Sequence, residues 1–272
     1  MHTWNILITA VVVALHPCLF SEEGNFLLYD LKTKQWIQEE GPHCDDRIAP
    51  CSTFKVPLSL IGFDAGILID ESSPQWPYRE CDDWSLPIHR QPHTPALWMR
   101  NSCVWYSQEL TTRLGMEQFQ HYVELFDYGN KDLSGDRDKK NGLTHAWLDT
   151  SLKISPREQI FFLEKLVRQS LPVSAHSIGM TKQILFLEEM NGWKLYGKTG
   201  SGHRLNADGT INRDLQNGWF IGWLEKDDRV VLFVFNLRDD EKVEGYGGPR
   251  AKEKTRALLL KFTAQPVSFP SS

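Results

Sequence analysis

Residues 52–63, STFKVPLSLIGF, constrain the fold more than any other stretch of the chain. Their apolar positions recur at helical spacing, Ser52 stands at the N-terminal end, and Gly66 follows the C-terminal end. The pattern predicts a helix over residues 52–63. Pro57 falls within about two turns of the predicted start, where a proline produces at most a local kink.

Strand patterns stand at both ends of the chain, outside this helix. Residues 26–37, FLLYDLKTKQWI, predict a hairpin with its polar turn at residues 32–34. After Trp193 the apolar period changes to two. The strands expected there cover residues 193–199, 218–224 and 229–237, with a turn at 225–228 and a closing helix at 251–262.

The middle of the chain has helical periodicity. Helices are expected over residues 105–114, 117–126, 156–170 and 181–189, and a solvated loop over 134–142. Ser155 as a cap, Pro156 at the first helical position and Glu158 three residues after the cap predict where the third helix begins.

Sequential strands usually pair, so the N-terminal hairpin is expected to join the C-terminal strands in one sheet. The predicted fold class is α+β, an α/β/α sandwich in which an antiparallel sheet formed from both chain termini is flanked by helices. A mainly helical subdomain is inserted at roughly residues 70–190. One domain covers residues 22–265, and residues 266–272 form a tail.

Composition and charge favour a globular protein that does not bind nucleic acid. The 272 residues are 41% hydrophobic and 24% charged, which is ordinary for a globular protein. The net charge is −5, and no block of Lys or Arg forms the basic patch that nucleic-acid binding requires. No nucleic-acid partner is therefore expected.

The first residues predict export. Residues 6–15, ILITAVVVAL, are too short to span a bilayer and suit the apolar region of a signal peptide, assigned to residues 1–21. The residues before them lack Lys and Arg, so a buried N-terminal helix is the alternative. No second long apolar run exists, so we expect a periplasmic protein without integral membrane association.

Five cysteines occur, at positions 18, 44, 51, 81 and 103. Export would permit disulfides, and Cys44 with Cys51 could close a small loop. Buried free thiols are an equally good interpretation. No C-x-x-C pair is present, and His89 and His93 flank Pro92 in a predicted loop, so no metal site is expected.

Two short motifs carry candidate chemistry. Ser52-Thr53-Phe54-Lys55 is the only Ser-x-x-Lys in the chain, and positions i and i+3 share a helix face, which holds an amine near a hydroxyl that needs a base. Lys198-Thr199-Gly200 ends a predicted strand, where Lys and Thr can bind a carboxylate. Alone, the first could be a capping serine with a solvated lysine, and the second a hairpin turn. In this order the two motifs mark penicillin-binding enzymes and serine β-lactamases.

The intervening motifs narrow the resemblance. With them, the chain resembles the class D, oxacillinase-type, serine β-lactamases from about residue 26 to about residue 262. The matching segments are Ser52-Thr53-Phe54-Lys55, Ser102-Cys103-Val104, Tyr128-Gly129-Asn130, Trp147-Leu148, Lys198-Thr199-Gly200 and Arg250. The resemblance implies the β-lactamase/transpeptidase-like fold. Cys51, beside Ser52, departs from the small or acidic residue expected there.

The resemblance implies a role for each matched residue. Ser52 would form the acyl-enzyme, and Lys55 would react with carbon dioxide or bicarbonate to give N6-carboxylysine, the general base. Trp147 would donate its indole N–H to that carbamate, and Ser102 would relay a proton to the lactam nitrogen. The backbone N–H groups of Ser52 and Ser201 would form the oxyanion hole. The substrate-binding residues would be Val104, Leu148, Lys198, Thr199, Gly200, Ser201 and Arg250.

The expected partner is a small β-lactam, with no separately bound cofactor, in a monomer or weak dimer. Two alternatives share this fold: a D,D-peptidase acting on cell-wall peptides, and the β-lactam-sensing domain of a receptor. Trp147 with the apolar Val104 and Leu148 favours hydrolysis over both.

Overall fold

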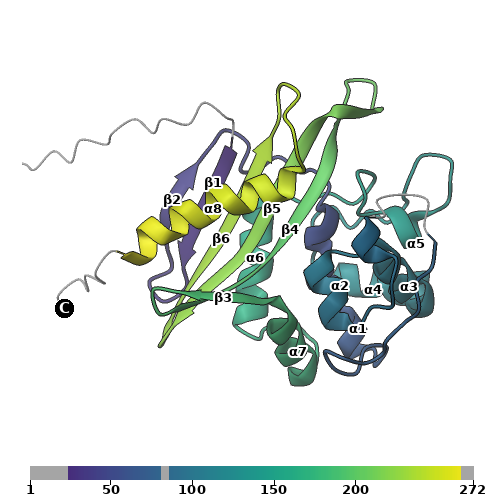
Figure 1. The fold of residues 1–272 in the computed structure, drawn as a ribbon, viewed down its shortest axis with the longest axis horizontal. Coiled ribbons are helices and arrows are strands. Elements are labelled where there is room, and N and C mark those ends of the chain that lie inside the picture. The colour runs from purple at the N-terminus through teal and green to yellow at the C-terminus, as the bar shows by residue number, and fades with distance from the viewer. Residues whose placement is uncertain (1–23, 81–85, 265–272) are drawn as a thin grey trace, which may run out of the picture.

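The computed structural model describes residues 24–80 and 86–264 (Figure 1). The predicted signal peptide, the tail, Cys18 and Cys81 lie outside these residues. The strands are β1 (Gly24–Asp30), β2 (Gln35–Glu40), β3 (Phe186–Met190), β4 (Trp193–Leu205), β5 (Ile211–Lys226) and β6 (Arg229–Arg238). They form one antiparallel sheet in the order β2-β1-β6-β5-β4-β3.

The helices follow one another between β2 and β3, apart from the last. They are the 3-10 turns η1 (Cys51–Phe54) and η2 (Pro87–His89) and the α-helices α1 (Lys55–Asp64), α2 (Pro95–Asn101), α3 (Val104–Leu114), α4 (Met116–Leu125), α5 (Gly142–His145), α6 (Pro156–Val167), α7 (Ala175–Leu185) and α8 (Gly247–Ala264).

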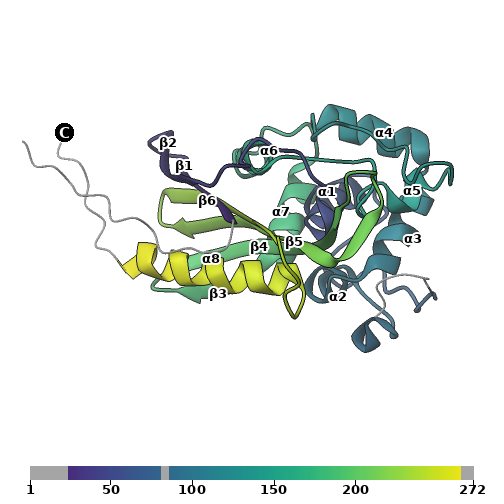
Figure 2. The ribbon, with the colours of Figure 1, turned by 90° about the horizontal axis from the view of Figure 1, so that it is seen from above.

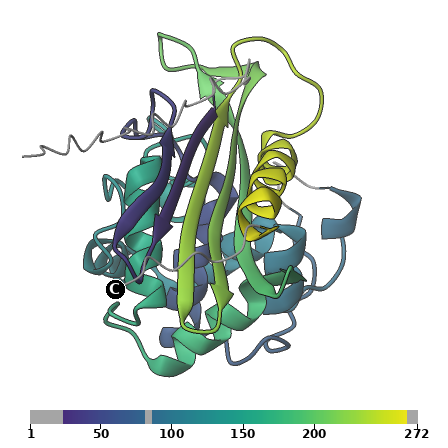
Figure 3. The same cartoon turned by 90° about the vertical axis from the view of Figure 1, so that its left-hand side faces the viewer.

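The predicted sandwich is confirmed. The N-terminal hairpin lies beside β6, so both ends of the chain build the sheet (Figure 3). Helix α8 covers one face, while α6 and α7 lie on the other (Figure 2). Helices α1 to α5 form a body beside the β4 side of the sheet (Figure 1).

Alternation along the central strands supplies both apolar layers. Ile221 and Val234 belong to the core beneath α6 and α7, whereas their neighbours Phe220 and Phe233 belong to the smaller core beneath α8. All four are fully buried. A strand buried on both faces has no polar side, which explains the nearly continuous apolar sequence of β5 and β6.

The prediction of a helix over residues 181–189 was wrong in two respects. Helix α7 already begins at Ala175, because Ser174 caps it by accepting from the Ser177 N–H at 3.2 Å. It ends at Leu185, and β3 follows as an edge strand paired with β4. Asn191-Gly192 makes the turn with φ of 49° and 77°, the left-handed conformation that this dipeptide favours in two-residue hairpins.

The other predicted helices and strands differ less from the observed ones at their boundaries. The predicted strands 193–199 and 218–224 are the inner parts of β4 and β5, which extend outward to Leu205 and Ile211. The capping box at Ser155 is confirmed: its Oγ accepts from the Glu158 N–H at 3.2 Å. Among residues 24–80 and 86–264, no helix combines the length and apolar character needed to cross a membrane.

The predicted 52–63 helix is present in two parts. Residues 51–54 form the tight turn η1, and α1 starts at Lys55. Pro57 is the third residue of α1, where its missing N–H costs no helix hydrogen bond. Ser52 therefore lies in the turn before the α-helix, on a segment that contacts β4 and β5.

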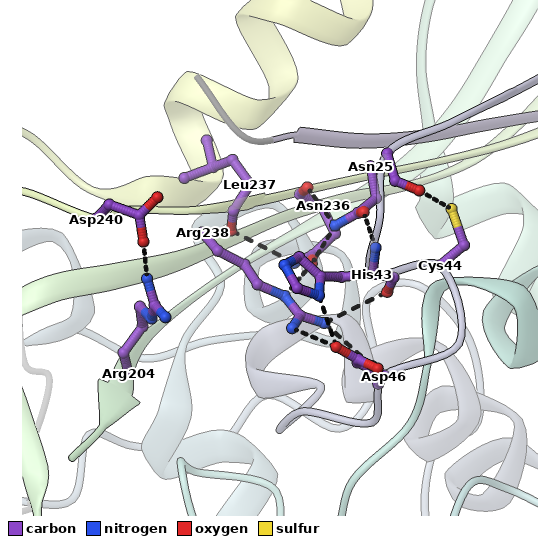
Figure 4. Close-up of polar contacts among 10 residues, drawn as sticks. Asn25, His43, Cys44, Asp46, Arg204, Asn236, Leu237, Arg238 and Asp240 are labelled. Atoms are coloured by element: carbon purple, nitrogen blue, oxygen red, sulfur yellow. Dashed lines mark hydrogen bonds and ion pairs between the residues drawn. The ribbon is translucent and has the colours of Figure 1, made fainter. Parts of the chain in front are cut away.

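The segment leading to Ser52 is attached to the sheet by polar contacts (Figure 4). Arg238 of β6 donates to Asn236 Oδ1 at 3.2 Å and to the Asp46 carbonyl at 3.2 Å. The His43 N–H donates to Asn25 Oδ1 at 2.8 Å, and the Trp219 indole donates to the Ala49 carbonyl at 3.0 Å. These bonds fix the approach to η1 relative to β1, β5 and β6.

Candidate active site

Ser52 and Lys55 face one another, as the i, i+3 spacing predicts. Lys55 Nζ lies 3.1 Å from Ser52 Oγ, and the Lys55 side chain is buried, with only 1% of its surface exposed. No carboxylate of the described chain pairs with it. Burial lowers the pKa of Lys55 to about 8, an effect opposed by the nearby thiols Cys103 and Cys51. The interpretation of Lys55 as a solvated surface lysine is therefore wrong.

A second lysine approaches from β4. Lys198 Nζ donates to Ser102 Oγ at 2.9 Å and to the Thr199 carbonyl at 2.8 Å. Burial lowers the pKa of Lys198 well below its usual value, and the neighbouring amines Lys55 and Lys252 act in the same direction. Ser102 ends α2 in the left-handed region, with φ of 59°, which directs the chain into α3 beside the cleft.

Aromatic side chains pack around Phe54, the residue before Lys55. Trp147 is buried and stacks on Phe54, with ring centroids 5.6 Å apart, while Phe119 meets its edge. The indole N–H of Trp147 donates to no residue that the structure describes. A buried indole usually finds an acceptor, and this one has none among the described residues.

A cleft of about 240 Å³ connects these elements. It brings together six of the predicted residues: Ser52, Ser102, Val104, Leu148, Thr199 and Ser201. Gly200 lies against η1, because a Cβ there would come within 2.9 Å of the Pro50 carbonyl. The absence of a side chain at Gly200 lets β4 approach the nucleophile turn.

Arg250 occupies a different position from the other predicted residues. It does not line the cleft, although its neighbour Pro249 does. Its two terminal nitrogens donate to Asp239 at 2.9 and 2.5 Å, and its buried Nε has no partner among residues 24–80 and 86–264. Asp239 was not among the predicted site residues.

Among the further cleft residues that were missed are Asn101, Asp149 and Tyr246; Cys51, Leu86 and His89 line the cleft as well. Asn101 and Asp149 directly adjoin the recognised Ser102 and Trp147-Leu148 segments, so their place along the chain was an available signal. Tyr246 carried none, since the turn into α8 brings it to the site. Tyr128-Gly129-Asn130 forms a turn in which Asn130 Nδ2 donates to the Ser151 carbonyl at 2.8 Å.

The predicted loop histidines and thiols have ordinary structural surroundings. His89 ends η2, and its Nε2 lies 2.9 Å from the Asn101 carbonyl. His93 is buried, with Nδ1 at 2.8 Å from the Gln91 carbonyl. Cys44 and Cys51 are buried free thiols, so the disulfide considered for this pair is not formed.

Comparison with known proteins gives a consistent result. The model of the penicillin binding protein transpeptidase domain matches residues 25–260. Beta-lactamase OXA-9 of Klebsiella pneumoniae is 43% identical over 229 residues, covering 84% of this chain and 83% of that protein. Beta-lactamase OXA-1 of Escherichia coli is 44% identical over 232 residues, covering 84% and 81%. The crystal structure of the OXA-427 class D β-lactamase superposes with a TM-score of 0.82 at 43% identity, covering 89% of this chain and all of that one.

Proposed function

This chain belongs to the class D β-lactamases, and from that premise we propose how its residues open penicillin-type antibiotics. Ser52 Oγ attacks the lactam carbonyl, the lactam C–N bond breaks, and an ester to Ser52 remains. Water then cleaves the ester and releases the ring-opened acid. The observation that carries the proposal is the 3.1 Å contact between Ser52 Oγ and the buried amine of Lys55, which has no carboxylate partner in the described part of the chain.

Lys55 is proposed to act as N6-carboxylysine. Its neutral amine adds to carbon dioxide, forming an N–C bond and releasing one proton, and the carbamate supplies the general base. The surroundings of Lys55 suit this group. Burial favours the neutral amine, and the Trp147 indole N–H has no acceptor among the described residues, which leaves it to donate to the carbamate. Val104 and Leu148, both lining the cleft, limit the access of water to the amine.

Residues on the β4 side of the cleft are proposed to protonate the lactam nitrogen and to stabilise the oxyanion formed from the lactam carbonyl. Ser102, held by Lys198 at 2.9 Å, returns the proton to the nitrogen as the ring opens. The backbone N–H groups of Ser52 and Ser201 receive the developing oxyanion, a contribution commonly worth about 3–4 kcal/mol. Gly200 makes this possible by allowing β4 to lie against η1.

The substrate carboxylate is proposed to bind at Thr199 and Lys198. Thr199 lines the cleft, and Lys198 Nζ lies 3.4 Å from Thr199 Oγ1. Arg250 lies next to the cleft residue Pro249 without lining the cleft itself, and Asp239 fixes the orientation of its guanidinium. Arg250 therefore contributes positive potential and support rather than the main contact.

We also propose that the enzyme is exported to the periplasm, on the strength of the apolar run at residues 6–15, and acts as a monomer or weak dimer. Cell fractionation and gel filtration test these two statements.

Steady-state nitrocefin hydrolysis combined with intact-mass spectrometry tests the function. The proposal predicts sustained turnover, with an adduct at Ser52 that is present during the reaction and gone when substrate is exhausted. Ser52→Ala should show neither turnover nor adduct. One turnover followed by a persistent adduct would instead identify a D,D-peptidase or a sensor domain.

A further inference from the structure

We propose that Asp149 is a positioning residue whose carboxylate holds the Trp147-Leu148 segment over Lys55 by joining it to Cys51 and to β4. The inference rests on the proposed carbamate at Lys55, and it assigns the residue that keeps the surroundings of that group in place. Asp149 lies between three elements that the reaction needs together: η1 with Ser52, the segment carrying Trp147, and the outer part of β4.

The Asp149 carboxylate has partners on both sides. Oδ1 accepts from the Cys51 thiol at 3.4 Å, and Oδ2 accepts from the His203 N–H at 3.0 Å. The His203 ring nitrogen Nδ1 lies 3.3 Å from the same Oδ2. Only 3% of the Asp149 side chain is exposed. Because burying a carboxylate is costly unless hydrogen bonds compensate, these contacts fix where it can lie.

Cys51 completes the connection on the nucleophile side. Its backbone N–H donates to the Trp147 carbonyl at 3.1 Å, so its main chain binds one end of the segment and its thiol the other. Burial raises the pKa of Cys51 well above its usual value, with the Asp149 charge acting in the same direction. The thiol therefore keeps its proton and remains a donor, and the pair does not become two adjacent anions.

The backbone of Asp149 adds a second constraint. Its φ of 56° is left-handed, a conformation that aspartate tolerates better than most residues. This turn reverses the chain immediately after Leu148, with the result that Leu148 lines the cleft while Trp147 stacks on Phe54. Without the carboxylate contacts, the segment would keep the aromatic packing of Trp147, the Cys51–Trp147 bond and local backbone bonds such as that from the Leu148 N–H to the His145 carbonyl at 2.8 Å, but it would lose its side-chain connection to β4.

Gly202 of β4 leaves the space that the contact between Asp149 and Cys51 occupies. A Cβ at Gly202 would lie 2.1 Å from Asp149 Oδ1 and 2.4 Å from Cys51 Sγ, distances that no packed atoms can adopt. Any side chain at position 202 would therefore displace the carboxylate, the thiol or the strand. Gly202 thus offers a way to disturb the contact without altering Asp149.

The test measures the carbamate directly. Purified wild type, Asp149→Ala, Asp149→Asn and Gly202→Ala are titrated with [13C]bicarbonate while the carbamate carbon is followed by NMR, with Lys55→Ala as the blank. The proposal predicts that half-saturation requires about 10- to 100-fold more bicarbonate in Asp149→Ala, the loss typical when an outer partner that orients a functional ligand is removed. Asp149→Asn, which can still accept from the His203 N–H, should fall between Asp149→Ala and wild type.

Asp214→Asn is the matched control. Asp214 is an exposed aspartate near the start of β5, and it forms an ion pair with Lys242. It should titrate as wild type does. Thermal unfolding identifies any variant that fails to fold, and Gly202→Ala then decides the question independently. Wild-type half-saturation in folded Asp149→Ala or Gly202→Ala overturns the role of Asp149 and leaves the carbamate standing. Absence of the signal from wild type overturns both.

Discussion

Two cations near the cleft lie in opposite environments: Lys55 beside Ser52, at the nucleophile end, and Arg250 behind the end proposed to bind the substrate carboxylate. At the nucleophile end, Lys55 is buried near two thiols, has no carboxylate partner among the described residues, and has its pKa lowered to about 8. At the carboxylate end, Arg250 is held by a two-point contact with Asp239. The first environment favours a neutral amine, whereas the second stabilises a fixed positive charge. This difference supports the proposed base chemistry at Lys55 and the proposed binding role at Arg250.

The largest effect is expected from removing the amine at the nucleophile end. Lys55→Ala should slow deacylation by about 10²- to 10⁴-fold, the usual loss when a general base is removed. Intact-mass spectrometry should find the Ser52 adduct long after substrate is exhausted. Lys194→Ala, an exposed lysine earlier on β4, is the control. Rapid clearance of the adduct in Lys55→Ala would exclude Lys55 as the base.

Trp147→Phe isolates the indole N–H from the stacking, because the phenyl ring can still lie on Phe54. We expect deacylation to slow by about 10- to 100-fold, with part of the loss recovered by added bicarbonate. The matched control is Trp36→Phe on β2, at the far edge of the sheet. A loss that bicarbonate leaves unchanged would mean that Trp147 only fills space.

Lys55→Met should stabilise the folded protein in carbon dioxide-free buffer. The folded-state pKa of Lys55 is lowered from 10.5 to about 8, and at roughly 1.4 kcal/mol per pH unit the charged amine costs about 3 kcal/mol. Below pH 8 the lysine is protonated in both states and the full cost applies. The cost fades between pH 8 and 10.5, where the folded state has released its proton and the unfolded state has not.

Urea denaturation at neutral pH and near pH 10.5 measures this difference. The advantage of Lys55→Met should be greatest at neutral pH and small at the alkaline end. A variant less stable than wild type at neutral pH would show that Lys55 is not strained by burial.

The smallest effect is expected at the carboxylate end. Because Asp239 already occupies the terminal nitrogens of Arg250, Arg250→Ala should raise KM about tenfold and change kcat little. Arg256→Ala, further along α8 and paired with Glu188, is the control. A fall in kcat at unchanged KM would place Arg250 in the chemical step and weaken the contrast between the two ends.

The nucleophile end was the more predictable of the two from sequence. Ser52 and Lys55 lie on one local turn, so their spacing alone predicts the contact. Lys198 and Ser102 are 96 residues apart, so no local pattern predicts their 2.9 Å bond. The Arg250–Asp239 pair was missed because its geometry is set by the turn into α8. This turn has no periodic sequence pattern from which the contact could be predicted.

The fold shows the same division between local and distant information. The capping box at Ser155 and the N-terminal hairpin follow from local residues and were predicted. Strand β3 was mistaken for helix because its apolar residues also fit a helical period, although the Asn191-Gly192 turn signalled a hairpin. The contact of Asp149 with Cys51 depends on a left-handed residue and on the absence of a side chain at Gly202, neither of which periodicity reveals.

The most direct test of the central claim is the turnover rate of wild type as a function of pH and bicarbonate. If Lys55 works as a carboxylated neutral amine, the rate should fall as the pH drops below about 8, because protonation of the amine competes with carboxylation, and added bicarbonate should restore part of it. A rate that responds to neither acidification nor bicarbonate would contradict the carbamate at Lys55.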